Sequence, residues 1–299
     1  MATDSTAEAT PSSAHRPIDV PWELNVPIAD LYIVGYGMRL PNDLTLETLA
    51  ILKRCKRLFG VPPINASSFG IPQMEDLSVL YAPDKPRMET YAEMTEQVLE
   101  AAADDPPVAF ATYGSAMVGT FPAHRLLEEA PRRGLTVHAA NAVSSFDGLW
   151  ADFNVEPFYG CQIWEASAFV DLDVVPDTKA IVLLPQAPIY GVKTGMDAER
   201  MRTEPRREMT KLKAYLRRFY PAEHVVYLAM TSGASADPLR SIVTPVKLED
   251  LNAVDAPLAA TLVVPRLDDA ARRFDFEGRA TSDVQPAYRE HDGSDAARE

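Results

Sequence analysis

Short apolar runs alternate with longer amphipathic stretches through the middle of the chain. Residues 30–37 form an apolar run that ends in two glycines, which predicts a buried strand followed by a tight turn. A helix should follow, because Thr45 can cap it and Glu47 would lie in its first turn. The apolar positions of that helix would be Leu46, Leu49, Leu52 and Cys55, with Cys55 in the core.

The alternation continues to residue 265 and predicts two cycles of strands and helices. The first cycle continues with strands at 78–81, 108–113 and 136–139 and helices at 87–103 and 123–130. The second has strands at 163–165, 180–185, 225–230 and 259–265 and a charged helix at 199–219. We therefore expect an α/β protein with two consecutive α/β domains and a cleft between them, where ligands of such folds usually bind.

The two ends of the chain differ in composition from its middle. Residues 1–28 are rich in Ala, Ser, Thr and Pro, which predicts a disordered arm. Residues 268–299 contain nine acidic and five basic residues and few aliphatic ones, which predicts a solvated acidic tail. The expected domains are then an N-terminal one at 29–142 and a C-terminal one at 143–267.

Composition excludes several classes of protein. The 299 residues are 46% apolar and 24% charged, as in a globular protein with a sizeable core. A net charge of −14 disfavours general nucleic-acid binding. The absence of an apolar signal region, of any 18-residue apolar run and of paired cysteine motifs predicts a cytoplasmic protein that spans no membrane. His124, His138 and His224 lack metal-ligand spacing, so no metal site is expected.

The glycine turn after the first strand has two interpretations. Gly35 and Gly37 resemble the start of a dinucleotide-binding fingerprint, but Leu40 stands where the third glycine would be. The alternative is that the two glycines only let the chain turn sharply. The turn alone does not decide between them.

Three sequence blocks together resemble the tetrapyrrole methylase superfamily of class III S-adenosylmethionine-dependent methyltransferases. The first is Gly35-Tyr36-Gly37 followed by the helix that starts near Leu44. The second places Tyr81, Arg87, Met88, Tyr91 and Met94 at spacings of the borosin peptide backbone α-N-methyltransferases, and the third runs from Asn141 through Asp152 to Ser167. The resemblance covers residues 30–267 and implies two α/β domains, S-adenosylmethionine as cofactor, and a homodimer.

The same resemblance implies which residues bind the cofactor. They are Gly35, Tyr113, Ser115, Val118, Ser144, Ser145, Gln186, Ala229, Ala260 and Thr261. Small residues let backbone amides approach a nucleoside, and neutral polar side chains can hydrogen-bond a cationic ligand. Tight packing in turns is the alternative explanation for the small residues.

It further implies that Tyr81, Arg87 and Tyr91 are catalytic, with a tyrosine and the arginine handling the proton and the second tyrosine assisting. Methylating an amide needs a base for the N–H proton and a cation beside the oxygen, because the nitrogen lone pair is delocalised. The spacing of four puts Arg87 and Tyr91 on one helix face, with Pro86 at the first helical position. Alternatively, Tyr91 packs with neighbouring apolar residues while Arg87 is solvated.

Several functions stay open. The leading one is N-methylation of the backbone of a separate, ribosomally made precursor peptide, because residues 274–299 lack the aliphatic segment that fused borosins modify. The second is methylation of a small molecule such as a porphyrinoid. The third is a non-catalytic binding partner, suggested by Gly114-Ser115-Ala116-Met117 standing where family members carry Gly-His-Pro-Gly or Gly-Asp-Pro. The basic segment 199–218 is either a solvated helix face or a docking surface for an acidic peptide.

Overall fold

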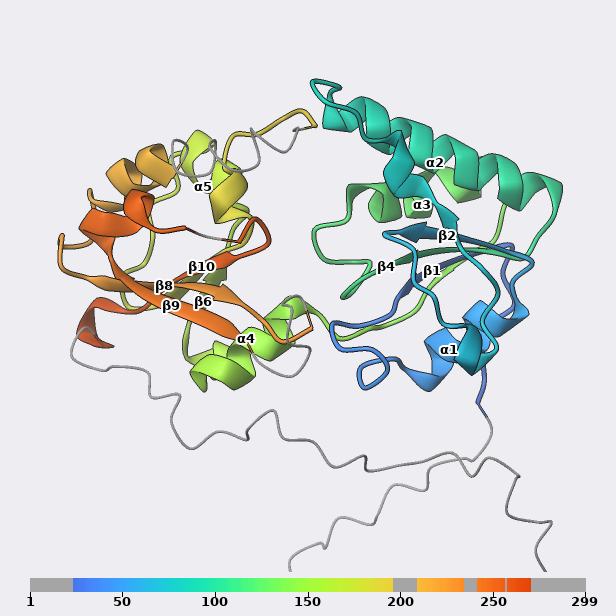
Figure 1. Ribbon diagram of the computed structural model, residues 1–299, viewed down its shortest axis with the longest axis horizontal. Helices are drawn as coiled ribbons and strands as arrows, with labels where there is room; N and C mark the ends of the chain where they lie inside the picture. The colour runs from blue at the N-terminus through green and yellow to red at the C-terminus, as the bar shows by residue number, and fades with distance from the viewer. Residues whose placement is uncertain (1–23, 196–208, 234–240, 256, 270–299) are drawn as a thin grey trace, which may run out of the picture.

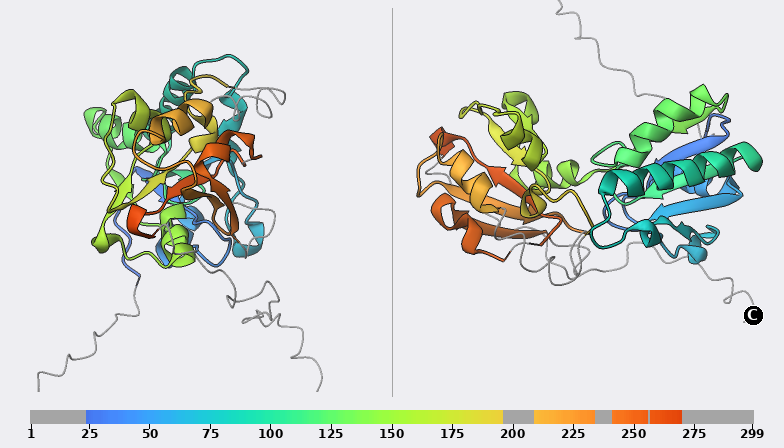
Figure 2. Two further views of the ribbon diagram at one scale, coloured as in Figure 1. Left: turned by 90° about the vertical axis from the view of Figure 1, so that its left-hand side faces the viewer. Right: turned by 90° about the horizontal axis from the view of Figure 1, so that it is seen from above.

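The computed structural model describes residues 24–195, 209–233, 241–255 and 257–269. Two α/β halves lie side by side, each with a central five-stranded sheet and helices on both faces (Figures 1 and 2). The predicted fold class, two consecutive α/β units, is confirmed.

The first half is a parallel sheet in the order β3-β2-β4-β1-β5. Its strands are β1 (Leu31–Gly35), β2 (Arg57–Val61), β3 (Glu75–Asp76), β4 (Val108–Thr112) and β5 (Val137–Ala139). The helices are α1 (Leu46–Arg54), α2 (Arg87–Asp104) and α3 (Phe121–Arg132), with 3₁₀ turns η1 (Ser67–Phe69) and η2 (Leu77–Leu80). α2 and α3 pack on one face of the sheet and α1 packs on the other (Figure 1).

The second half is a mixed sheet in the order β6-β7-β10-β8-β9, in which only β6 and β7 pair in parallel. The strands are β6 (Cys161–Ile163), β7 (Ile181–Leu184), β8 (Val225–Met230), β9 (Ile242–Lys247) and β10 (Thr261–Val264). The helices are α4 (Ser145–Phe153) and α5 (Ala166–Asp171), with 3₁₀ turns η3 (Pro157–Tyr159), η4 (Ala187–Ile189), η5 (Leu248–Ala253) and η6 (Leu267–Asp269). α4 packs on one face, and α5 with the helical residues 209–216 packs on the other.

The start of the chain's first helix was predicted correctly. The Thr45 hydroxyl accepts a hydrogen bond from the Thr48 backbone N–H at 3.1 Å, so one of the free donors of α1 is satisfied. Cys55 is buried, as expected. Leu46 was assigned to the buried face wrongly: its side chain is 73% exposed, and Thr48 and Ile51 fill the buried face instead.

Some predicted elements in the first half were wrong. Residues 78–81 were expected to be a strand but mostly belong to η2, whose first turn is capped by the Asp76 carboxylate. The strand next to β4 is β2, which the sequence analysis missed. Pro86 is the N-cap of α2 rather than its first residue, which is Arg87.

In the second half, the strand predicted at 163–165 lies two residues earlier, as β6. Strand β9 was missed because it contains Pro245, which cannot donate to a sheet. The strand tolerates it because β9 is at the edge and pairs only with β8. α4 and α5 were also not predicted.

The predicted arm and acidic tail and the first part of the predicted helix at 199–219 lie largely outside the described residues. Within that helix, residues 209–216 are helical. Among the described residues, none of the helices is both long and apolar enough to cross a membrane.

Candidate active site

Two adjoining cavities lie between the halves. The first cavity has a volume of about 480 Å³ and the second about 420 Å³. The second is lined by Tyr81, Tyr91 and Tyr113, and we refer to it as the tyrosine cavity. Both cavities share the lining residues Tyr113, Gly119, Thr120, Gln186, Ile189 and Leu258. A ligand in the first cavity would therefore be next to one in the tyrosine cavity.

The loop after β4 forms the wall that the first half contributes to the first cavity. Tyr113, Ser115 and Val118, which the resemblance implies as cofactor-binding residues, line this cavity. Gly114 within this loop has a φ of 64° and exchanges two backbone hydrogen bonds with Gly37, at 2.8 and 3.1 Å. The loop thus crosses the glycine turn after β1 and is held to it.

Gly35 does not line the cavity. A Cβ atom at this position would lie 2.2 Å from the Gly114 carbonyl oxygen and 2.9 Å from the Ser115 Cα. Gly35 is therefore needed because two backbones cross closely, and its contribution to the cavity is to bring the Gly114 loop into place. Of the two interpretations of the glycine turn, the one in which glycine only lets the chain turn and pack closely explains Gly35.

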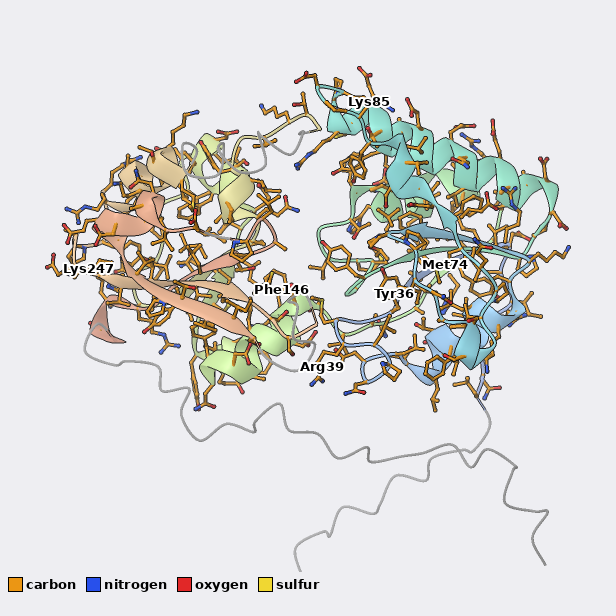
Figure 3. The ribbon with its side chains drawn as sticks, viewed as in Figure 1. Tyr36, Arg39, Met74, Lys85, Phe146 and Lys247 are labelled. Atoms are coloured by element: carbon orange, nitrogen blue, oxygen red, sulfur yellow. The ribbon has the colours of Figure 1, made fainter. Side chains whose placement is uncertain are left out.

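Strand ends and the start of α4 form the wall of the second half. Ser144 and Ser145 line the cavity at the N-terminus of α4, where Ser144 and Asp147 form a capping box. Gln186, Ala229 and Thr261 line it from the ends of β7, β8 and β10. Ala260 does not: it is buried in the core on the α5 face of the sheet. Phe146 of α4 completes this wall at the boundary between the halves (Figure 3).

Gln186 has an unusual backbone. Its φ of 60° is in the left-handed region, which residues other than Gly, Asn and Asp seldom adopt. Such conformations cost of order 1–3 kcal/mol and cluster at functional sites. Gln186 lines both cavities, so the strained residue lies where the two meet.

The sequence analysis missed other lining residues of the first cavity, among them Met38, Glu165, Met230 and Thr231. Thr231 is 3% exposed, and its hydroxyl has no hydrogen-bond partner among the residues that the structure describes. A buried hydroxyl without a partner carries a cost that a bound polar ligand can remove. Glu165 is the only charged residue among the described lining residues and also caps α5 through the Ala168 N–H.

The structure brings Tyr81, Arg87 and Tyr91 together in the tyrosine cavity. Tyr81 follows η2, Arg87 is the first residue of α2, and Tyr91 lies one turn further along that helix. The rings of Tyr81 and Tyr91 meet edge to face, with their centroids 6.3 Å apart. Tyr91 also stacks on Phe121 at 5.8 Å and packs against the core, so the core-packing interpretation holds for its ring.

Desolvation governs the ionisation of Tyr81. It raises the pKa of the Tyr81 phenol above its usual value, and the neighbouring Tyr91 phenol raises that pKa further. The positive charge of Arg87 lowers the pKa of Tyr81, but by less than desolvation raises it. Tyr81 therefore keeps its proton near neutral pH and can donate it in a hydrogen bond to the Tyr91 oxygen.

Arg87 is the only charged residue among the described residues that line the tyrosine cavity. The other lining residues are aromatic, aliphatic or neutral and polar. The tyrosine cavity thus offers one fixed cation and two phenols in largely apolar surroundings, where a charge interaction is stronger than in water.

A model of the tetrapyrrole (corrin/porphyrin) methylase family matches residues 30–163, which run from β1 to β6. This stretch is a tetrapyrrole methylase domain. The domain contains Tyr81, Arg87 and Tyr91. It also contains the wall that the first half contributes to the first cavity.

Curated relatives of this tetrapyrrole methylase domain include fungal proteins. The methyltransferase and type III borosin cyclic peptide precursor of Anomoporia bombycina is 33% identical over 171 residues, which are 55% of this chain and 19% of that protein. The type II borosin counterpart of Phlebiopsis gigantea is 28% identical over 254 residues, 80% of this chain and 43% of that protein. The chain thus matches less than half the length of these relatives.

Solved structures share the fold of both halves. Uroporphyrin-III C-methyltransferase from Thermus thermophilus superposes with a TM-score of 0.55 at 16% identity, over 79% of this chain and 94% of that one. A cobalt precorrin-4 methyltransferase gives a TM-score of 0.52 at 14% identity, with the same coverage. At these identities the likeness concerns the fold.

Proposed function

We propose that the chain is a S-adenosylmethionine-dependent methyltransferase that methylates backbone amide nitrogens of a ribosomally made precursor peptide in trans, as a cytoplasmic homodimer. The observation that carries the proposal is the tyrosine cavity: two tyrosines in ring contact and one arginine line a space that adjoins the first cavity. The borosin relatives, which are named as methyltransferases and cyclic peptide precursors, support a peptide substrate.

The first cavity fits S-adenosylmethionine by its donor set. Eight of the ten residues that the resemblance implies line it, and the unpartnered Thr231 hydroxyl and the Glu165 carboxylate add polar groups. A relative in fold from Thermus thermophilus, with a TM-score of 0.51, has been solved with S-adenosylhomocysteine. When bound, the cofactor would supply an electrophilic methyl group on a sulfonium.

The chain's own residues would activate the amide. Arg87 would stabilise the negative charge that develops on the amide oxygen as the N–H proton leaves. Tyr91, as the phenolate formed once its own proton has been released to solvent, would take the amide proton and become a neutral phenol again. Tyr81, which keeps its own proton, would stabilise that phenolate by donating a hydrogen bond to its oxygen. Phe121 stacks on the Tyr91 ring and holds it in place.

The charge of the tyrosine cavity favours a peptide over a porphyrinoid. Biosynthetic porphyrinoids carry several carboxylates, and each would need a cation or a hydrogen-bond donor when removed from water. The described lining offers Arg87 alone. A peptide amide flanked by apolar side chains places a single developing charge in this cavity and needs a single cation.

Two measurements test the proposal. Calorimetry should detect binding of S-adenosylhomocysteine. Mass spectrometry of the chain with candidate precursor peptides and S-adenosylmethionine should find methyl groups on backbone amides of the peptide and none on the chain itself. Methylation of the chain's own residues would overturn the trans arrangement, and cofactor binding with no turnover on any peptide or porphyrinoid would favour the non-catalytic alternative.

The homodimer and the cellular location have separate support. The resemblance to borosins suggests the dimer, and light scattering at micromolar concentration should give twice the chain's 32.9 kDa. A mass of one chain would contradict it. The cytoplasmic location is supported by Cys55 and Cys161, which are both unpaired, as thiols are in a reducing compartment.

The substitution Thr231→Val should weaken the affinity for S-adenosylhomocysteine and leave the fold as stable as before or more stable. Valine keeps the shape of threonine and removes the hydroxyl, which finds no partner in the described part of the chain. A lost hydrogen bond of about 1–1.5 kcal/mol corresponds to about a tenfold loss of affinity, whereas removing a buried hydroxyl without a partner relieves its desolvation cost. Calorimetry and thermal melting measure the two effects. Unchanged affinity would show that the hydroxyl does not contact the ligand.

A further inference from the structure

A segment of the second half reaches across to the first half beside the tyrosine cavity. Residues 191–195, which we call the strap, follow η4 and run against the loop at residues 82–86. In Figure 1 the segment after η4 extends from the second half to the start of α2. Gly195 of the strap lines the tyrosine cavity.

The loop at 82–86 has the two proposed proton-handling residues at its ends. Tyr81 comes immediately before it, and Arg87 immediately after it begins α2. Any shift of this loop therefore moves Tyr81 and Arg87 relative to each other and to Tyr91.

Within the loop the Lys85 N–H donates to the Ala82 carbonyl at 3.3 Å, and the Lys85 ammonium donates to the Leu80 carbonyl at 3.0 Å. The other residues of the loop offer little of this kind. Pro83 and Pro86 have no N–H, and Asp84 has a left-handed backbone with a φ of 61°. Pro86, the N-cap of α2, offers no side-chain cap to the free N–H groups of the helix. The backbone at the start of α2 therefore needs acceptors from outside the helix.

The strap supplies what the loop lacks. The Arg87 N–H, which has no acceptor within α2, donates to the Lys193 carbonyl at 3.0 Å. The Gly195 N–H donates to the Lys85 carbonyl at 2.9 Å, and its carbonyl accepts from the Asp84 N–H at 3.2 Å. These three backbone bonds hold both sides of the loop.

The closeness of this contact requires a glycine. A Cβ atom at position 195 would lie 2.0 Å from the Ala82 carbonyl oxygen, well inside any contact that atoms can make. The obstacle is backbone, so a larger residue would displace the strap from the loop. The backbone of Gly195 has no positive φ that would strain alanine, so the contact alone explains the glycine.

The same segment is continuous with the wall of the first cavity. Gln186 and Ile189, which line both cavities, precede the strap by a few residues. The strap thus connects the wall of the second half to the loop that carries Tyr81 and Arg87.

We propose that residues 191–195 position Tyr81 and Arg87 against the wall of the first cavity, and that Gly195 is a positioning residue for the methyl transfer. This inference rests on the proposed function for its effect on rate. Its structural part, that the strap holds the loop and the start of α2, is independent of which substrate is methylated.

The variant Gly195→Ala tests the proposal against Lys193→Ala as a matched control. The control changes a side chain of the strap and leaves the Lys193 carbonyl that accepts from Arg87. We expect Gly195→Ala to lower kcat by about 100-fold, as misplacing catalytic groups by about 1 Å can do, with little change in the dissociation constant of S-adenosylhomocysteine. Lys193→Ala should keep a rate near that of the wild type. A kcat for Gly195→Ala equal to that of Lys193→Ala would overturn the positioning role.

Amide hydrogen exchange tests the strap without any turnover. In the wild type the Arg87 amide should be protected, although a first helical N–H is normally free to exchange. Gly195→Ala should raise exchange in a peptide covering residues 82–88 and leave the later turns of α2 unchanged. Fast exchange of the Arg87 amide in the wild type would refute the strap even if Gly195→Ala did not fold. Protection there together with a wild-type chain that methylates nothing would instead count against the proposed function.

Discussion

Replacing Tyr91 with phenylalanine should reduce the rate of peptide methylation by about 10²- to 10⁴-fold, the usual contribution of a general base. The substitution keeps the ring, which stacks on Phe121 and packs against the core, and removes only the hydroxyl. Single-turnover methylation with bound S-adenosylmethionine measures the chemical step. The affinity for S-adenosylhomocysteine should stay near that of the wild type, because Tyr91 lines only the tyrosine cavity.

Tyr36→Phe is the matched control for this variant. Tyr36 is also buried in the first half, and its hydroxyl donates to the Pro62 carbonyl at 2.9 Å, but it lines neither cavity (Figure 3). Losing that hydrogen bond should cost about 1 kcal/mol of stability without affecting the rate. If Tyr91→Phe and Tyr36→Phe behave alike, Tyr91 is a core residue and the proton has another acceptor.

Arg87→Lys separates charge from geometry at the same site. Lysine keeps the positive charge but loses the planar guanidinium, so the methylation rate should fall strongly if two donors contact the amide oxygen. Arg87 also opposes the raised pKa of Tyr81, so Arg87→Met should raise that pKa further. Titration of the tyrosine absorbance in Arg87→Met and in Arg87→Met with Tyr81→Phe would isolate this shift. An unchanged Tyr81 pKa would mean that Arg87 and Tyr81 do not interact.

The sequence predicted the fold where local signals agree with the tertiary structure. β1, β4, β7 and β8 are short, uniformly apolar runs, and parallel or central strands buried on both faces have this pattern. β2 and β9 were missed because their patterns conflict with strand formation. Arg57 starts β2 with a charge and pairs with Glu75 of β3, and Pro245 interrupts β9.

The site could be predicted only in part for a related reason. Tyr81, Arg87 and Tyr91 are close in sequence, so a motif and helical spacing bring them together. Thr231 and Glu165 belong to no local pattern and gain their significance from the cavity between the halves. Residues whose role depends on one half touching the other, such as Gly195 and Gly233, give no sequence signal beyond being glycine.

Gly233→Ala should weaken S-adenosylhomocysteine binding by about 100-fold. A Cβ atom at this position would lie 2.0 Å from the Met38 carbonyl oxygen, and Met38 lines the first cavity. The contact joins the halves at the opposite end of their boundary from the strap: Figure 3 labels Arg39, next to Met38, at the lower end and Lys85, which contacts the strap, at the upper end. Forcing an extra methyl group into packed structure costs up to about 3 kcal/mol, which corresponds to about 100-fold in affinity if the halves separate to relieve it.

Gly134→Ala is the control, because Gly134 has a similar backbone, with a φ of 76° against 90° for Gly233, but no atoms within 4 Å of an added Cβ. Both variants carry the cost of a left-handed alanine, and only Gly233→Ala obstructs the contact between halves. Calorimetry on the two variants therefore measures the contact alone, and equal affinities would show that the first cavity does not depend on Gly233 meeting Met38.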